Sequence, residues 1–203
     1  MKKLVIVGTG LLAEVVCTYF RQGGEYEVVA FAADQAHAEG QPELMGLKVE
    51  DFHEIERRYS PVDHEVFVAI GYRGLNRIRA RFFEQTKAKG YRCASYMDRS
   101  VVTWPGFRLG ENVLICEDNT IQPFVTIGDD TFLWSGNHIG HHSKVGSHVF
   151  ISSHVVISGS CTLGDYSFFG VNATVRASFA AYSTLAEVEA LLRGLHEVRR
   201  MFA

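Results

Sequence analysis

The second half of the chain repeats every six residues, and this period limits the possible folds more than any other feature of the sequence. Counted in sixes from Phe107, the third residue of each hexad is bulky and apolar, at Leu109, Ile115, Ile121, Ile127, Leu133, Ile139, Val145, Ile151, Ile157, Leu163, Phe169 and Val175. At a hydrophobic content of 47%, twelve such residues in one register would arise by chance about once in ten thousand trials. A sustained period of six predicts a parallel β-helix.

The first hundred residues follow a different pattern, in which short apolar runs alternate with amphipathic ones. This pattern predicts strands that alternate with helices. The expected strands are 4–7, 27–31 and 66–70, and the expected helices are 11–20 and 75–89. The sequence therefore predicts an α/β, Rossmann-like domain, and parallel sheets of this kind bind ligands at the carboxyl ends of their strands.

The period of six ends after Val175, because Ala181 and Glu187 would take the next inward positions. Ser183 and Thr184, followed by Glu187, resemble a capping box, and an apolar stripe at helical spacing comes after them. A C-terminal helix that covers the open end of the solenoid is expected. The predicted parts are an α/β domain over 1–100, a β-helix over 101–180 and a capping helix over 181–203.

Charge and cysteine usage exclude several classes of function. The 20 basic and 23 acidic residues give a net charge of -3, and no run is rich in Lys and Arg, so nucleic acid is not an expected partner. The four cysteines are scattered without a Cys-x-x-Cys pair, which fits a reducing compartment. No stretch approaches the ~18 apolar residues of a membrane span. We expect a cytoplasmic protein that does not contact a membrane.

Three of the repeats carry a resemblance to a known family. Val125 to Asp130, Ser143 to His148 and Cys161 to Tyr166 resemble the left-handed β-helix of hexapeptide acyltransferases. With the preceding α/β domain and its Gly8-Thr9-Gly10 turn, the chain is similar, over roughly residues 3 to 178, to the subfamily of bacillosamine N-acetyltransferases and sialic acid O-acetyltransferases. The resemblance implies a homotrimer that uses acetyl-CoA as co-substrate, and its usual setting is cell-surface polysaccharide biosynthesis.

The resemblance also implies a catalytic base. His141 stands where the family has its catalytic histidine, two residues after the inward Ile139. Histidine suits proton transfer near neutral pH because its ordinary pKa is about 6.5. An acidic residue commonly follows that histidine in the family, whereas this chain has His142. Either a carboxylate such as Glu117 or Asp118 orients His141, or His142 holds its ring by a hydrogen bond.

Other positions acquire roles from the same alignment. The backbone N–H of Gly159, eighteen residues after His141, would face the thioester carbonyl of acetyl-CoA and stabilise developing negative charge. Asn137 and His138 would line the groove between β-helices, where they either bind substrate or form ladders along the turns. Phe150 stands where the family can use a histidine toward acetyl-CoA, so that contact must differ here.

The α/β domain is expected to bind the nucleotide sugar. A Gly-x-Gly turn between a strand and a helix lets backbone amides approach a phosphate. By position in the family, the substrate-binding residues are Gly8, Gly10, Ala33, Asp34, Gly71, Tyr72 and Asn76. Family members often carry a histidine where this chain has Leu12. The alternative is that this domain only packs and positions, with Tyr72 and Asn76 capping a helix.

The predicted function is acetyl transfer from acetyl-CoA to the amine of a nucleotide-linked sugar. Two alternatives stay open, namely O-acetylation of a sugar hydroxyl and a non-catalytic trimer that binds sugar nucleotides. A β-helical zinc carbonic anhydrase is disfavoured, because His142, His148 and His154 are six apart and would lie on successive sides of a coil. No metal is expected.

Overall fold

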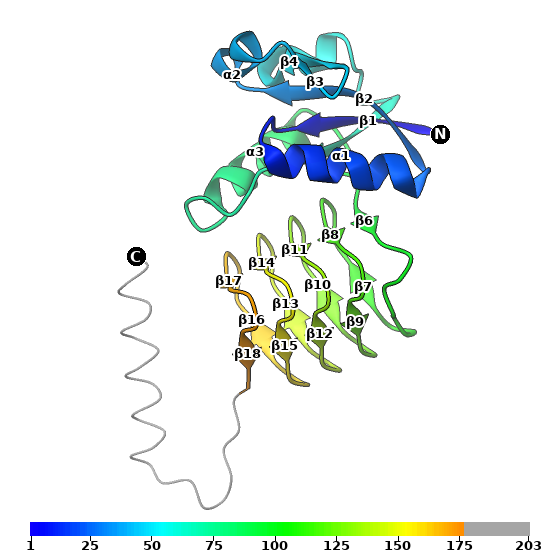
Figure 1. Ribbon diagram of the computed structural model, residues 1–203, viewed down its shortest axis with the longest axis vertical. Coiled ribbons are helices and arrows are strands. Elements are labelled where there is room, and N and C mark those ends of the chain that lie inside the picture. The colour runs from blue at the N-terminus through cyan, green and yellow to red at the C-terminus, as the bar shows by residue number, and fades with distance from the viewer. Residues whose placement is uncertain (177–203) are drawn as a thin grey trace, which may run out of the picture.

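The computed structural model describes residues 1–176 and shows an α/β domain resting on one side of a triangular β-helix (Figure 1). This is the predicted Rossmann-like domain followed by a left-handed parallel β-helix. The expected helix of residues 181–203, with its capping box, lies outside the described residues, and the boundaries at residues 100 and 180 stay predictions. No helix in the described part of the chain has the length and apolar character that a bilayer crossing requires.

The α/β domain is built on one mostly parallel sheet with the strand order β3-β4-β2-β1-β5. Its strands are β1 (Lys2–Val7), β2 (Tyr26–Ala33), β3 (Glu43–Leu44), β4 (Leu47–Asp51) and β5 (His64–Val68), of which β3 is antiparallel to β4. Its helices are α1 (Leu11–Gly23), α2 (Gln35–Gly40), the 3-10 helix η1 (Phe52–Arg57) and α3 (Arg77–Ala88). The chain order reverses at β1, which pairs with both β2 and β5, and such a switch point opens a crevice at the strand ends.

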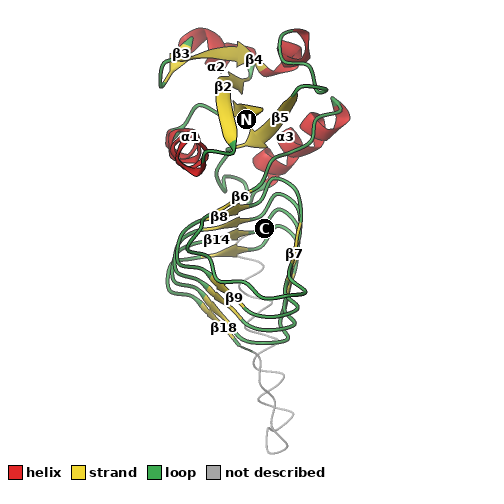
Figure 2. Cartoon of the chain, turned by 90° about the vertical axis from the view of Figure 1, so that its right-hand side faces the viewer, coloured by secondary structure: helices red, strands yellow, loops and turns green. Residues whose placement is uncertain are grey.

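The β-helix contains one two-residue strand per hexad, and each strand ends on one of the predicted inward residues (Figure 2). These strands are β7 (Arg108–Leu109), β8 (Leu114–Ile115), β9 (Thr120–Ile121), β10 (Thr126–Ile127), β11 (Phe132–Leu133), β12 (His138–Ile139), β13 (Lys144–Val145), β14 (Phe150–Ile151), β15 (Val156–Ile157), β16 (Thr162–Leu163), β17 (Phe168–Phe169) and β18 (Thr174–Val175). Each strand pairs with the strand three hexads away, as Ile127 pairs with Val145. One coil is therefore three hexads.

The strands form three sheets, one on each side of the triangle. Their orders are β16-β13-β10-β7, β18-β15-β12-β9 and β17-β14-β11-β8-β6, where β6 (Tyr96–Met97) starts the third side ahead of the hexads. The inward side chains from Ile115 to Leu163 form one buried cluster, as the period predicts. Leu109 is 37% exposed because it belongs to the first coil, which has a neighbour on one side only.

The third side of the triangle is the one that the α/β domain covers. Its outward side chains include Leu114, Phe132 and Phe150, which are buried in the same cluster as residues of β1, β2 and α1. Phe67 of β5 stacks on Phe132, with ring centroids 5.6 Å apart. Phe150 is thus packed beneath the α/β domain and is closed to an acyl donor.

A buried ion pair joins the two parts. Arg79 of α3 donates from Nε to Asp130 Oδ1 at 2.9 Å, and both side chains are fully buried. Asn112 donates to the same carboxylate at 2.7 Å and also bonds the backbone of Val68, while His148 Nδ1 lies 2.8 Å from the other carboxylate oxygen. Burial lowers the pKa of Arg79, and Asp130 opposes this. Because every charged atom has a partner, the network ties α3 and β5 rigidly to the β-helix.

Asp130→Asn is expected to destabilise the protein by about 3–5 kcal/mol, because it leaves the Arg79 guanidinium buried without a counter-ion. Urea unfolding followed by circular dichroism measures this. As a control, Glu56→Gln removes the more exposed Lys89–Glu56 pair and should cost less than about 1 kcal/mol. Equal losses in the two variants would contradict the role given to the buried network.

Candidate functional site

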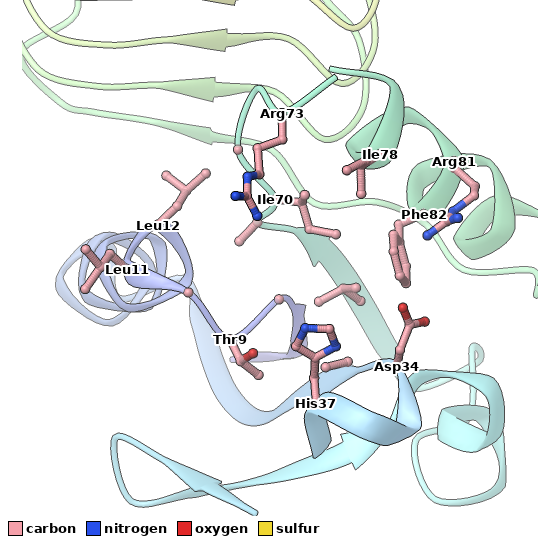
Figure 3. A pocket seen from close by; sticks show the side chains of 16 residues that line it. Thr9, Leu11, Leu12, Asp34, His37, Ile70, Arg73, Ile78, Arg81 and Phe82 are labelled. Carbon is pink, nitrogen blue, oxygen red and sulfur yellow. The ribbon is translucent and has the colours of Figure 1, made fainter. Parts of the chain in front are cut away.

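A cleft of about 600 Å³ opens at the carboxyl ends of β1, β2 and β5 (Figure 3). Five of the predicted substrate-binding residues line it, namely Gly8, Gly10, Ala33, Asp34 and Gly71. The amino terminus of α1 faces the same space, where Leu11 and Leu12 contribute to the wall. The cleft thus combines free helix-terminal amides with the ends of three strands, an arrangement that suits a phosphate group.

Gly8 is required by the shape of the turn between β1 and α1. Its φ is +127°, and a Cβ atom placed on it would lie 2.7 Å from the carbonyl oxygen of Ala69. Gly10 differs, because a Cβ there would meet nothing within 4 Å. Only the first glycine is therefore fixed by close approach of the backbone, here to the end of the segment that follows β5.

Three basic side chains in the cleft were missed by the sequence analysis. Arg73 follows Gly71 in the loop after β5, His37 lies on α2, and Arg81 lies on α3. Figure 3 shows Arg81 near the Asp34 carboxylate and Arg73 on the opposite wall. Arg73 could have been found from its place just after a strand, whereas Arg81 sits mid-helix among other basic residues and carries no such signal.

Tyr72 and Asn76 are not among the residues that line the cleft. Burial argues against the predicted substrate contact of Asn76, whereas Tyr72 is 53% exposed and its contact with substrate stays a prediction. Tyr72 turns toward the β-helix, where its ring packs on Phe150 and Phe168 with centroids 4.9 Å away in each case. Asn76 is fully buried; it donates to the Ser167 carbonyl and accepts from Arg79. Both residues fasten the loop after β5 to the β-helix.

The predicted catalytic pair lies at an open corner of the triangle. His141 and His142 are exposed in the turn between β12 and β13, and their Nδ1 atoms are 3.2 Å apart, within hydrogen-bond distance. The turn is held by the previous coil, since the His141 N–H donates to Gln122 Oε1 and the His142 N–H donates to the Pro123 carbonyl. Of the two arrangements expected from the sequence, the contact with His142 is the one present.

The carboxylate proposed as an alternative partner is engaged elsewhere. Glu117 accepts hydrogen bonds from the Ser135 hydroxyl and from the Tyr19 hydroxyl, each at 2.7 Å, and the Ser135 bond holds its pKa below the ordinary value. Asp118 occupies a different corner, the one that also carries His154. Neither carboxylate makes a hydrogen bond or an ion pair with His141.

His141 packs against Gly159 of the next coil. A Cβ atom on Gly159 would lie 2.7 Å from His141 Nε2, so only glycine leaves room for the ring in this position. Within residues 1–176 the Gly159 N–H donates no hydrogen bond. An imidazole nitrogen and a backbone amide therefore meet at one exposed spot.

Asn137 is not in a groove, which corrects its prediction as a substrate contact. Its side chain is 1% exposed inside the coil, where it donates to the Trp134 carbonyl and accepts from the Val155 N–H. It therefore forms the ladder that was the other expectation for this position. His138 lies on β12 with an outward, partly exposed side chain.

Within one chain the cleft and the histidine pair are on opposite sides of the β-helix. The α/β domain covers the side formed by β8, β11, β14 and β17, and His141 lies at the corner where the other two sides meet. Among the described residues no group of three His, Cys, Asp or Glu side chains could hold a metal ion.

Two sequence families match the chain. The model of the bacterial transferase hexapeptide (six repeats) matches residues 124–159, and that of the PglD N-terminal domain matches residues 3–86. The predicted resemblance to hexapeptide-repeat sugar acyltransferases is confirmed. No curated protein matches the chain.

Solved structures share the fold. PerB from Caulobacter crescentus, in complex with CoA and GDP-perosamine, is 24% identical with a TM-score of 0.65, over 88% of this chain and 91% of that chain. WeeI from Acinetobacter baumannii AYE is 16% identical with a TM-score of 0.72, over 88% of this chain and 82% of that chain. Both likenesses extend across the α/β domain and the β-helix together.

Gly8→Ala should destabilise the protein by about 1–3 kcal/mol, because alanine strains the backbone at this φ and its methyl group meets the Ala69 carbonyl. Gly10→Ala, at the start of α1, should cost less than about 1 kcal/mol. Thermal unfolding of the two variants tests this, and a loss at Gly10 as large as at Gly8 would contradict the account of the turn.

Proposed function

We propose that this protein is an acetyl-CoA-dependent N-acetyltransferase that acts on a nucleotide-linked amino sugar. The observation that carries the proposal is the placement of His141, whose ring lies against Gly159 and within hydrogen-bond distance of His142 at an open corner of a hexapeptide β-helix. The fold shared with PerB, whose solved complex contains CoA and GDP-perosamine, supports the same class of reaction.

The proposed reaction uses the two nitrogens of His141 differently. When Nδ1–H donates to Nδ1 of His142, Nε2 is unprotonated and can accept a proton from the attacking sugar amine. The amine nitrogen forms a bond to the thioester carbon, and the carbonyl oxygen becomes an oxyanion that the Gly159 N–H stabilises. Collapse of this intermediate breaks the carbon–sulfur bond, and His141 passes the proton that it took from the amine to the CoA thiolate.

The identity of His142 favours an amine over a hydroxyl as the acceptor. A carboxylate partner would stabilise the imidazolium by its charge, whereas a neutral imidazole supplies a hydrogen bond alone. A neutral amine is already a good nucleophile and loses its proton easily once it is attached to the carbonyl. A sugar hydroxyl needs a stronger base at the start, so O-acetylation fits this pair of histidines less well.

The cleft of the α/β domain is proposed to hold the nucleotide. Arg73, Arg81 and His37 supply positive charge for a diphosphate, beside the helix-terminal amides of α1. Asp34 follows β2, the position from which an acidic side chain contacts a ribose hydroxyl in related sheets. Gly8, Gly10, Ala33 and Gly71 let the ligand approach the backbone closely.

We propose that the cleft serving His141 belongs to another copy of the chain, in a homotrimer. The support is that the protein's own α/β domain covers the side of the triangle opposite the His141 corner. Acetyl-CoA would lie between neighbouring β-helices, with His138 on the wall. The four free cysteines agree with a cytoplasmic setting.

His141→Ala should lower the turnover number by about 10²–10⁴-fold, because the variant lacks a group to take the proton from the amine. Release of CoA thiol is measured with acetyl-CoA and a panel of UDP-, GDP- and dTDP-linked amino sugars. His154→Ala, at another corner of the same β-helix, is the control and should retain activity. Turnover that survives His141→Ala would remove the proposed base, and no turnover of any sugar by the wild type would favour the non-catalytic trimer.

Mixing two inactive variants should restore activity if the site is shared between copies. One variant carries His141→Ala and the other carries Arg73→Met with Arg81→Met, so that each lacks a different part of the site. After the mixture is unfolded and refolded together, about a quarter of the sites in a random trimer would combine an intact His141 with an intact cleft. Thiol release measures the recovery. If the mixture stays as inactive as its parents, each chain uses its own cleft.

A further inference from the structure

Phe124 is a large apolar side chain held in the open beside the histidine pair. It is 56% exposed, and its ring lies with its centroid 4.7 Å from that of His142. On its other side is Gly106, where a Cβ atom would lie 2.8 Å from Phe124 Cδ1. Gly106, Phe124 and His142 occupy equivalent positions in three successive coils. The phenyl ring lies between these neighbours at 41° to the His142 ring, while much of its surface faces solvent.

The turn of the coil requires a left-handed backbone at every corner, and Phe124 is an unfavourable residue for that conformation. Its φ is +64°, in the left-handed region that bulky side chains avoid. At the other corners of the β-helix, the left-handed position holds a residue suited to this conformation, except at Tyr166, whose ring is packed. The residues at these positions are Asn112, Asp118, Asp130, Gly136, His142, His148, His154, Ser160, Tyr166 and Asn172. Tyr166 stacks on His148 and is partly buried, whereas Phe124 is 56% exposed even though its ring contacts that of His142.

The segment that carries Phe124 is fixed to the catalytic turn. Gln122 accepts from the His141 N–H at 2.9 Å, and Pro123 accepts from the His142 N–H at 3.0 Å. These bonds hold the position of the ring relative to His141. A bulky apolar side chain kept exposed in a left-handed conformation, beside candidate catalytic groups, indicates a binding role, since such an unfavourable residue persists where function uses it.

The order of the coils tells which substrate Phe124 meets. Under the proposed function, on which this step rests, the thioester carbonyl lies at Gly159, one coil beyond His141. The acceptor must then reach His141 from the other side, because the nucleophile and the acyl carbon cannot occupy the same space. Phe124 lies on that side, one coil before His142.

We propose that Phe124 forms the apolar wall of the acceptor subsite and packs against the C–H face of the pyranose ring, thereby orienting the amine toward His141. A pyranose presents hydroxyl groups at its edge and C–H groups on its faces, and a flat aromatic ring buries such a face without needing polar partners. Phe124 is a binding residue in this account. It contributes no proton transfer.

Phe124→Asn separates binding from folding, because asparagine tolerates a positive φ and removes the exposed ring. With GDP-perosamine as acceptor, the expected result is a KM for the sugar about tenfold higher, the size of an apolar contact in a specificity pocket. The KM for acetyl-CoA should stay unchanged, and the melting temperature should stay the same or rise. Phe124→Tyr keeps the aromatic face and should retain the wild-type KM.

His154→Asn is the matched control, since it also replaces a ring by asparagine at a left-handed corner, away from His141. It should leave the KM for the sugar unchanged. A lower melting temperature in Phe124→Asn would mean that the ring is structural, a change in the KM for acetyl-CoA would place it on the donor side, and loss of the oligomer in sedimentation would assign it to contacts between copies. Each of these results overturns the proposal.

Calorimetry tests the role of Phe124 in sugar binding without relying on the proposed reaction. Binding of GDP-perosamine is compared with binding of GDP to the wild type, and the ratio of the two affinities measures the sugar's contribution. Phe124→Asn should reduce that ratio toward one while leaving the affinity for GDP unchanged. If the wild type acetylates no sugar, the proposed reaction fails, but the ratio of affinities still tests whether Phe124 binds the sugar. A ratio in the variant equal to that of the wild type, or a ratio of one in the wild type, would overturn the proposed acceptor subsite.

Discussion

The stacking of residues eighteen positions apart is the constraint on which the rest of this protein depends. Strand pairs such as Ile139 with Ile157 fix that spacing on every side of the triangle, so each position in a coil has a vertical neighbour that the sequence order determines. At the corners, the same stacking brings side chains together, as with Asp130 and His148 or Phe124 and His142. The fold thus arranges residues eighteen positions apart in vertical columns, and the size and charge of one side chain limit which residues can stand above and below it.

The corners divide between two uses of these columns. One corner is buried against the α/β domain, and there Asn112, Asp130 and His148 hold Arg79 in a network without free charge. The corner opposite the covered side is exposed and carries His141 and His142, with the backbone of the previous coil holding them. The first corner fixes the α/β domain rigidly in place, which a shared site between copies requires, because small displacements of bound groups slow a reaction greatly.

The period of six predicted the β-helix and its inward aliphatic residues because a solenoid repeats its contacts at constant spacing. It could not assign Asn137, since this residue occupies a second inward position where a buried amide satisfies the backbone of the next coil. In the loop after β5, the prediction treated neighbours alike, yet Gly71 and Arg73 face the cleft while Tyr72 faces Phe150. The chain bends at Tyr72 and turns from Arg73 to Asn76, and the direction of each side chain there depends on packing partners far away in the sequence. Arg79 was also beyond the sequence, because a basic residue on an amphipathic helix is ordinarily solvated.

The corner that carries His141 shows how one vertical stack of residues limits the stack beside it. The His141 ring occupies the space that a side chain at Gly159 of the next coil would need, and the Phe124 ring does the same at Gly106 of the previous coil. Gly159 and Gly106 therefore lie at the two ends of one exposed region. Between them, His141 Nδ1 lies 3.2 Å from His142 Nδ1, and the proposed choice of an amine acceptor rests on this contact. A larger residue at either glycine would close one approach to His141, whereas the buried corner beneath the α/β domain would be unaffected. The arrangement proposed for this corner, with donor and acceptor on opposite sides of one imidazole, therefore rests on the two positions where the chain has glycine in place of a side chain.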